Sequence, residues 1–151
     1  MKIEGPDRYQ LTFTATEFVV LGANGTNQFS GMATSNLPKL YIASIDEAPI
    51  YVGLTKQSIR NRLRLGWNPR LKTGYHGYAW RHGNTAANLD VWCHVDAVNR
   101  NERDIETVEA EVVFLIRTAG QWPQFQTEIH FHPSLPVHRQ VAAAIAAHYK
   151  I

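Results

Sequence analysis

Short runs of β-branched, aromatic and aliphatic residues lie in the middle of the chain. The runs "LYIASI" (residues 40–45) and "PIYVGL" (residues 49–54) are separated only by "DEA". Two strand-type runs with so short a connection predict an antiparallel hairpin, with Pro49 at the opening of its second strand. A later run, "ANLDVWCHVDAV" (residues 87–98), alternates with period two and predicts a third strand beside the hairpin.

Apolar positions three or four residues apart predict three helices. Thr55 or Ser58 caps the first, which runs to about Gly66 with Ile59 and Leu63 on its apolar face. The second is expected from about residue 103 to residue 118. Residue 136, a proline, opens a third, alanine-rich helix that packs as a lid on the sheet.

The rest of the chain sets the expected architecture. Residues 1–37 join an alternating run to a stretch rich in turn formers, and predict an accessory strand or short helix. No repeat or linker divides the 151 residues, which are enough to bury one core. The prediction is a single α+β domain. Its core at residues 38–132 would hold a small three-stranded antiparallel sheet flanked by helices, with a C-terminal helix in residues 133–151.

Composition narrows the setting of the protein. The chain has one cysteine, Cys93, which excludes an internal disulfide framework and favours a reduced, cytoplasmic environment. Its place in the alternating run predicts a buried structural thiol. The first residues lack the apolar core of a signal peptide, and no run approaches the roughly 18 apolar residues of a membrane span. No membrane partner is expected.

Charge is distributed unevenly although the net charge is only +2. Residues 51–89 contain no Asp or Glu, so they form a local cationic field suited to a polyanion such as nucleic acid. A solvated helix face followed by a basic loop is the other interpretation of this charge. The basic residues in the stretch are Lys56, Arg60, Arg62, Arg64, Arg70, Lys72 and Arg81.

One acidic residue stands out on the second predicted helix. On a helical wheel Glu109 falls within the apolar face, between Ile105 and Ile116 on one side and Val113 on the other. Glu111 lies at the outer edge of that face. A carboxylate on a core face is costly unless it is paired, protonated or bound to a metal. Glu109 is therefore a candidate functional residue, with a structural ion pair as the alternative.

The order of these pieces resembles the catalytic domain of the GIY-YIG nuclease superfamily. That order is a strand with a tyrosine, a hairpin, a second tyrosine strand ending in glycine, an arginine-bearing helix, a third strand, and a helix with an inward glutamate. The two tripeptides of the family name would be "LYI" at residues 40–42 and "YVG" at residues 51–53. The first departs from the pattern, and the resemblance covers roughly residues 39–126.

The resemblance implies a role for each matching residue. The two motif tyrosines fall on Tyr41 and Tyr51, which would orient or deprotonate the attacking water. The helix arginine falls on Arg62, with Arg60 as the alternative, and would neutralise phosphate charge. Lys56 would assist as a point charge.

The same resemblance implies one divalent cation, Mg²⁺ or Mn²⁺, held by Glu109 on the scissile phosphate. Glu111 is the alternative ligand on that helix. The late polar residue of the family falls on Gln126 in "WPQFQ".

One departure affects the expected proton transfer. Many family members place a His or Tyr one helical turn after the arginine, and here that position is Gly66. The following loop, "GYHGYAW", offers replacements. Tyr75, His76 and Tyr78 are candidates for the base or its helper, with His76 as a candidate for proton transfer. Tyr75 and Tyr78 are also expected to contact the nucleic acid.

The resemblance thus implies a metal-dependent endonuclease that hydrolyses DNA. Phosphate contacts and base stacking would hold the strand. Restriction-type and structure-selective enzymes, single- and double-stranded substrates, and a homodimeric state all stay open. A binding module of the same fold that has lost catalysis is the second hypothesis, and a structural or interaction protein is the third. The expected nucleic-acid contacts are Arg60, Arg64, Arg70, Lys72, Tyr75, Tyr78, Trp80, Arg81 and Gln126, with Trp67 beside them.

Overall fold

The predicted hairpin is present and has a tight turn. In this computed structural model, which describes residues 1–67, 80–96, 102–121 and 131–151, strand β3 (Lys39–Ile45) pairs antiparallel with β4 (Ala48–Thr55). Asp46 and Glu47 form the turn with φ angles of 52° and 65°. Hairpins with two-residue turns favour such positive φ angles, because they match the twist of the flanking strands.

The sheet has five strands, so the prediction of three strands is wrong. The additional strands are β1 (Ile3–Phe13) and β2 (Phe18–Gly22), both from the N-terminal segment that was expected to be accessory. The order is β2-β1-β5-β3-β4, where β5 is Ala86–His94, and all neighbours are antiparallel. β1 pairs with β5, some 80 residues away, and no local pattern reveals such a pairing. The α+β class is confirmed.

The predicted helices lie close to their expected positions. Ser58 is the N-cap of the first, and its hydroxyl oxygen accepts a hydrogen bond from the backbone N–H of Asn61. The C-terminal helix begins with a proline at a position whose N–H needs no intrahelical partner. The helices are η1 (Gly31–Thr34), α1 (Ile59–Gly66), α2 (Trp80–Gly83), α3 (Glu102–Thr118) and α4 (Pro136–Ala146).

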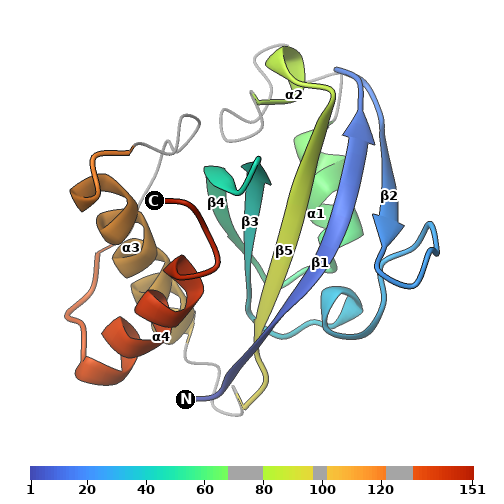
Figure 1. Ribbon diagram of the computed structural model, residues 1–151. Helices are drawn as coiled ribbons and strands as arrows, with labels where there is room; N and C mark the ends of the chain where they lie inside the picture. Colours follow the sequence, from blue (N-terminus) through green and yellow to red (C-terminus); the bar gives the residue numbers. More distant parts are fainter. Residues whose placement is uncertain (68–79, 97–101, 122–130) are drawn as a thin grey trace.

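The sheet separates two hydrophobic clusters, one on each face. One contains residues of β1, β2, η1 and α1, together with Tyr41, Tyr51 and Leu89. The other joins Leu40, Val52 and their neighbours to α3 and α4. Figure 1 shows this arrangement, with α3 and α4 on one side of the sheet and α1 on the other. Because β4 is an edge strand, groups from both faces can approach it at the open edge.

Two polar networks fix the C-terminal segment to the rest of the domain. Asp90, fully buried on β5, accepts hydrogen bonds from Arg8 Nε at 2.8 Å and from the Tyr149 hydroxyl at 2.6 Å. Asp104 on α3 lies between two histidines, 2.9 Å from His138 Nε2 and 3.2 Å from His94 Nε2. Both networks contain residues that are distant in sequence.

Two further features bear on the sequence-based expectations. Cys93 is completely buried, as expected for a structural thiol. Within the described parts of the chain, no helix has the length and apolar character needed to cross a membrane.

Candidate functional site

Two tyrosines meet on adjacent strands at the centre of the candidate site. Tyr41 on β3 faces Gly53 of β4 in the hairpin register, and Tyr51 faces Ala43 one pleat away. The two tyrosine rings are 5.9 Å apart between centroids, and their side chains are hydrogen-bonded. The pair is almost closed to solvent, since Tyr41 is 0% and Tyr51 6% exposed.

The glycine of "YVG" makes room for this pair. A Cβ atom at Gly53 would lie 2.5 Å from Cζ and 2.7 Å from the hydroxyl oxygen of Tyr41, and 2.8 Å from a ring carbon of Tyr51. Contacts this short do not occur in folded proteins without displacement of the neighbours. The spacing of Tyr51 and Gly53 in the sequence thus has a steric reason, because the glycine allows Tyr41 to lie against the β4 backbone.

Charges from two helices act on the Tyr51 hydroxyl. The positive charge of Arg62 on α1 lowers its pKa, whereas the negative charge of Glu109 on α3 raises it. The two helices pack on opposite faces of the sheet, and Tyr51 belongs to the edge strand where both can reach. Four separate elements thereby bring together Tyr41, Tyr51, Arg62 and Glu109, which were selected from the sequence.

The pKa of Tyr51 limits what its hydroxyl can do. Burial is the main cause that raises this pKa far above its usual value, and the charge and hydrogen bond of Tyr41 add to it. The lowering effect of Arg62 is smaller. At neutral pH Tyr51 therefore remains protonated in this state, so that its hydroxyl can donate a hydrogen bond or orient a water but does not act as a phenolate base.

Glu109 has the inward position predicted from the helical wheel. Its side chain is 6% exposed on the face of α3 that packs towards the sheet. Among the described residues, no group of three or more Asp, Glu, His or Cys side chains is arranged to hold a metal ion. One carboxylate still fits Mg²⁺, because this ion commonly binds through one or two carboxylates, several waters and substrate phosphate oxygens.

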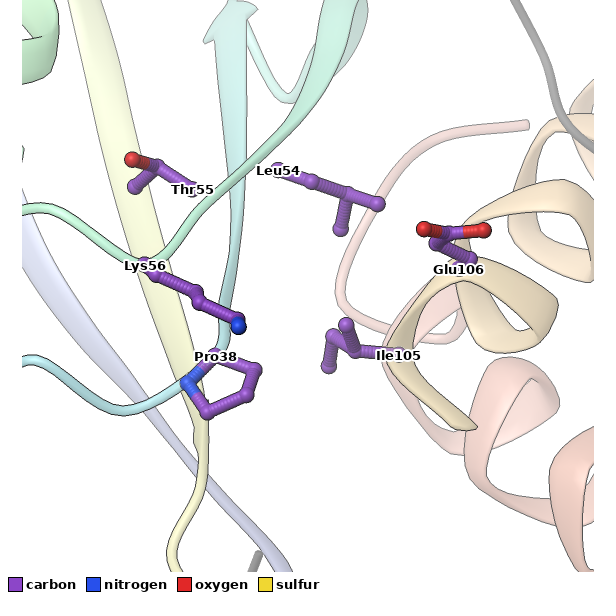
Figure 2. Close-up of a pocket in the computed structure, with 6 residues that line it drawn as sticks. All are labelled: Pro38, Leu54, Thr55, Lys56, Ile105 and Glu106. Carbon is purple, nitrogen blue, oxygen red and sulfur yellow. The ribbon is translucent and has the colours of Figure 1, made fainter. Parts of the chain in front are cut away.

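A pocket of about 160 Å³ lies between β4 and the first turn of α3, and exposed Lys56 lines it. Figure 2 shows Lys56 on the β4 side and Glu106 on the α3 side of this pocket. Glu106 comes three residues, about one helical turn, before Glu109. The Glu106 carboxylate lies 2.6 Å from Nε2 of His132. The pocket thus brings Lys56 opposite Glu106, one helical turn before Glu109 on α3.

A buried lysine that the sequence did not single out holds the backbone next to Lys56. The ammonium group of Lys39 is 0% exposed and donates hydrogen bonds to the carbonyl oxygens of Ser35, Leu37 and Lys56. Burial lowers the pKa of Lys39 to about 8. Lysine is usually exposed, so no pattern in the sequence marks it as a buried residue. Its carbonyl contacts connect the chain before β3 to the chain after β4.

The arginines of α1 divide between two sides of the helix. Arg62 is half-buried on the side of Tyr51, whereas exposed Arg64 and half-buried Arg60 project from the other side. This separation follows from the helical period, which places Arg62 about 160° from both of them. The structure thus assigns Arg62 rather than Arg60 to the tyrosine pair.

Two predicted nucleic-acid contacts are wrong because the side chains are buried. Trp80 is 0% exposed and packs edge-on against Phe13 and Trp67, at centroid distances of 5.2 and 5.0 Å. Trp67 is likewise buried, and its indole N–H donates to the carbonyl of Thr14 at 2.9 Å. Neither ring can stack on a base. Both rings belong to the hydrophobic cluster that also contains Phe13.

The cationic residue beside Trp80 is buried as well. Arg81 is 4% exposed, and its Nε donates to the carbonyl oxygen of Ala15 at 3.3 Å. Burial lowers its pKa. Arg81 is therefore not a surface phosphate contact as predicted, since its guanidinium group lies within the protein. The remaining predicted site residues, Arg70, Lys72, Tyr75, His76, Tyr78 and Gln126, lie outside the described residues.

Comparisons with known proteins found no match to this chain. No family model matches the chain, and neither a curated protein nor a solved structure matches it. Function must therefore be argued from the site itself.

Proposed function

We propose that the protein is a divalent-metal-dependent endonuclease that hydrolyses phosphodiester bonds of DNA, in the manner of the GIY-YIG superfamily. One observation carries the proposal: Tyr51 interacts with the side chain of Tyr41 and with the charges of Arg62 and Glu109. These four residues come from β3, β4, α1 and α3. All four are among the residues that the family pattern selected from the sequence.

Each side chain has a chemical task in this proposal. Arg62 carries a planar guanidinium group that can donate two parallel hydrogen bonds to phosphate oxygens and offset their charge. Tyr51, which stays protonated, orients the attacking water or donates to a phosphate oxygen. Tyr41 fixes the position of Tyr51 through their hydrogen bond. Lys56, exposed just after β4, supplies a further positive charge for the substrate.

Glu109 would hold Mg²⁺ or Mn²⁺ through its carboxylate. When bound, such an ion withdraws electron density from the phosphate and stabilises the leaving oxygen. In the hydrolysis, the attacking water loses one proton as its oxygen bonds to phosphorus, the bond to one sugar oxygen breaks, and the departing oxygen takes up a proton. Glu106, one helical turn before Glu109, lines the pocket that holds Lys56, and its carboxylate lies 2.6 Å from Nε2 of His132.

The test is cleavage of labelled single- and double-stranded DNA by the purified protein with Mg²⁺, Mn²⁺ or EDTA. The protein should cut DNA only with a divalent cation, and Glu109→Ala should abolish cutting while DNA binding survives. Glu111→Ala is the comparison variant, because Glu111 is the alternative ligand and lies half-buried on the same helix; it should keep cutting if Glu109 holds the metal.

A catalytically inactive DNA-binding module is the second candidate function. The observation that favours it is the burial of Tyr41 and the strongly raised pKa of Tyr51, which leave neither hydroxyl as a ready base. Salt-sensitive DNA binding without cutting under any metal condition would support this module and contradict the nuclease.

A further inference from the structure

A groove lies on the side of α1 opposite Arg62. It has a volume of about 580 Å³. It is lined by residues in and just before η1 and by one side of α1. We call it the α1 groove. Its lining residues are Asn27, Gln28, Phe29, Ala33, Thr34, Ser58, Arg60 and Arg64.

The charge of this groove is positive. Its two ionisable side chains are Arg60 and Arg64, and among the described residues neither has a carboxylate partner. The chain around it contains little negative charge, because residues 18–89 include only two acidic residues, Asp46 and Glu47. The carboxylate of Glu47 is already engaged by Arg8.

The side chain of Arg60 is held in place before any ligand binds. Its guanidinium carbon lies 5.7 Å from the centre of the Phe29 ring, and Nη2 donates to the carbonyl oxygen of Asn27 at 3.3 Å. A cation–π contact and a hydrogen bond limit the entropy that this long side chain loses on binding. Arg64 is one helical turn further along, with about 5–6 Å expected between the two Cβ atoms.

The lining chemistry fits a nucleic-acid strand. Two arginines one turn apart can contact neighbouring phosphates, and Asn27 and Gln28 add exposed amide groups that can hydrogen-bond to base edges. Ser58 and Thr34 add hydroxyl groups to the lining. We propose that the α1 groove binds the DNA strand next to the cleavage site, and that residues 27 and 28 contribute to sequence preference.

This inference rests on the proposed function for the class of ligand, since it assigns the groove to the same DNA. It adds that α1 has two tasks, with Arg62 facing the tyrosine pair and Arg60 and Arg64 holding a flanking part of the substrate. It also gives the N-terminal segment, which the sequence presented as accessory, a part in binding.

The test measures binding separately from cutting. Fluorescence anisotropy with a labelled DNA oligonucleotide in EDTA, over a range of salt concentrations, compares the wild type with the double variant Arg60→Gln/Arg64→Gln. We expect a loss of affinity of about tenfold or more, and a fall of about 1.5–2 in the slope of log K against log salt. The control is Arg103→Gln/Arg139→Gln, which removes the same charge from exposed positions on α3 and α4.

The outcomes separate this inference from the nuclease proposal. If the groove variant binds DNA with the wild-type affinity and salt slope, or if the control loses as much affinity, the proposed role of the α1 groove is wrong. Metal-dependent cutting by the wild type would still support the nuclease in that case. Weaker binding by the groove variant alone supports the groove even where no cutting occurs. A second variant, Asn27→Ala/Gln28→Ala, should change the relative affinities for oligonucleotides of different sequence. Uniform affinities across sequences in both wild type and variant would contradict the proposed sequence preference.

Discussion

A Cβ atom on Gly53 would lie 2.7 Å from the hydroxyl oxygen of Tyr41, on the neighbouring strand. Tyr41 and Gly53 are direct partners in the β3–β4 register. The side chain of Tyr41 is in turn hydrogen-bonded to that of Tyr51. Gly53 therefore sets the position of one tyrosine, and through it of the other.

This contact predicts that Gly53→Ala both destabilises the protein and lowers activity. Forcing a methyl group into a filled space usually costs about 1–3 kcal/mol, and the displaced Tyr41 would no longer hold Tyr51. The free energy of unfolding from urea titration measures the first effect and the DNA cleavage rate the second. The control is Gly83→Ala, because no described atom lies within 4 Å of the added Cβ there. Equal, small effects of both substitutions would contradict the steric role of Gly53.

Arg62→Lys keeps the charge near Tyr51 but removes the planar guanidinium group. If Arg62 contacts the phosphate with two hydrogen bonds, we expect the cleavage rate at saturating DNA to fall by about 100-fold. Arg103→Lys, an equivalent change at an exposed position on α3, should leave the rate unchanged. An Arg62→Lys variant that cuts DNA at the wild-type rate would show that the positive charge alone, without the guanidinium group, is sufficient for cleavage.

The network around Asp90 predicts a stability effect far from the tyrosine pair. Tyr149→Phe removes the 2.6 Å hydrogen bond to the buried Asp90 carboxylate, and hydrogen bonds to charged groups contribute about 1.5–3 kcal/mol. Tyr9→Phe is the matched control, since within the described part of the chain the Tyr9 hydroxyl bonds to the neutral backbone of Ser30. Urea titration should show the larger loss for Tyr149→Phe. A smaller loss than for Tyr9→Phe would contradict the role of this network.

Asp104 predicts a dependence of stability on pH. Burial alone would raise its pKa, but the hydrogen bonds of His138 and His94 outweigh burial and hold the pKa below its usual value. The unfolded chain then binds a proton more readily than the folded one. The stability that Asp104 contributes is thus fully present above the usual carboxyl pKa of about 4, and is lost as the pH falls through the lowered value.

The measurement compares wild type with Asp104→Asn by urea titration at several pH values. At pH 7 the variant should be less stable by about 1.5–3 kcal/mol, and this difference should shrink below about pH 4. Asp7→Asn, on β1 at a half-buried position, is the control for removal of a carboxylate. A difference that is constant between pH 7 and pH 3 would exclude the proposed role of Asp104.

The sequence predicted the local features of this fold well. The β3–β4 hairpin, the Ser58 cap of α1, the span of α3 and the inward position of Glu109 all depend on patterns within about twenty residues. It did not predict that the N-terminal segment contributes β1 and β2, because β1 is stabilised by pairing with β5 far along the chain. Binary patterns show which side of an element is apolar, and do not identify the element that covers it.

The candidate site divides in the same way. Tyr41, Tyr51, Arg62 and Glu109 were accessible to sequence reasoning because the family pattern and the helical wheel both depend on spacing. Trp80 and Arg81 are buried although the sequence predicted them to be exposed, since neither belongs to a periodic run of apolar residues that would signal burial. Lys39 was missed for a related reason, because its carbonyl partners belong to turns that only the fold brings together.

The most direct test of the nuclease proposal is the single-turnover rate of DNA cleavage as a function of Mg²⁺ concentration, for wild type, Glu109→Gln and Glu111→Gln. Both substitutions remove one charge from α3, and thermal unfolding checks that both variants are folded. We expect wild type and Glu111→Gln to share one metal-saturation curve, and Glu109→Gln to be slower by at least about 100-fold. A Glu109→Gln variant that cuts DNA at the wild-type rate with the same Mg²⁺ dependence would contradict the assignment of Glu109, and with it the proposed site.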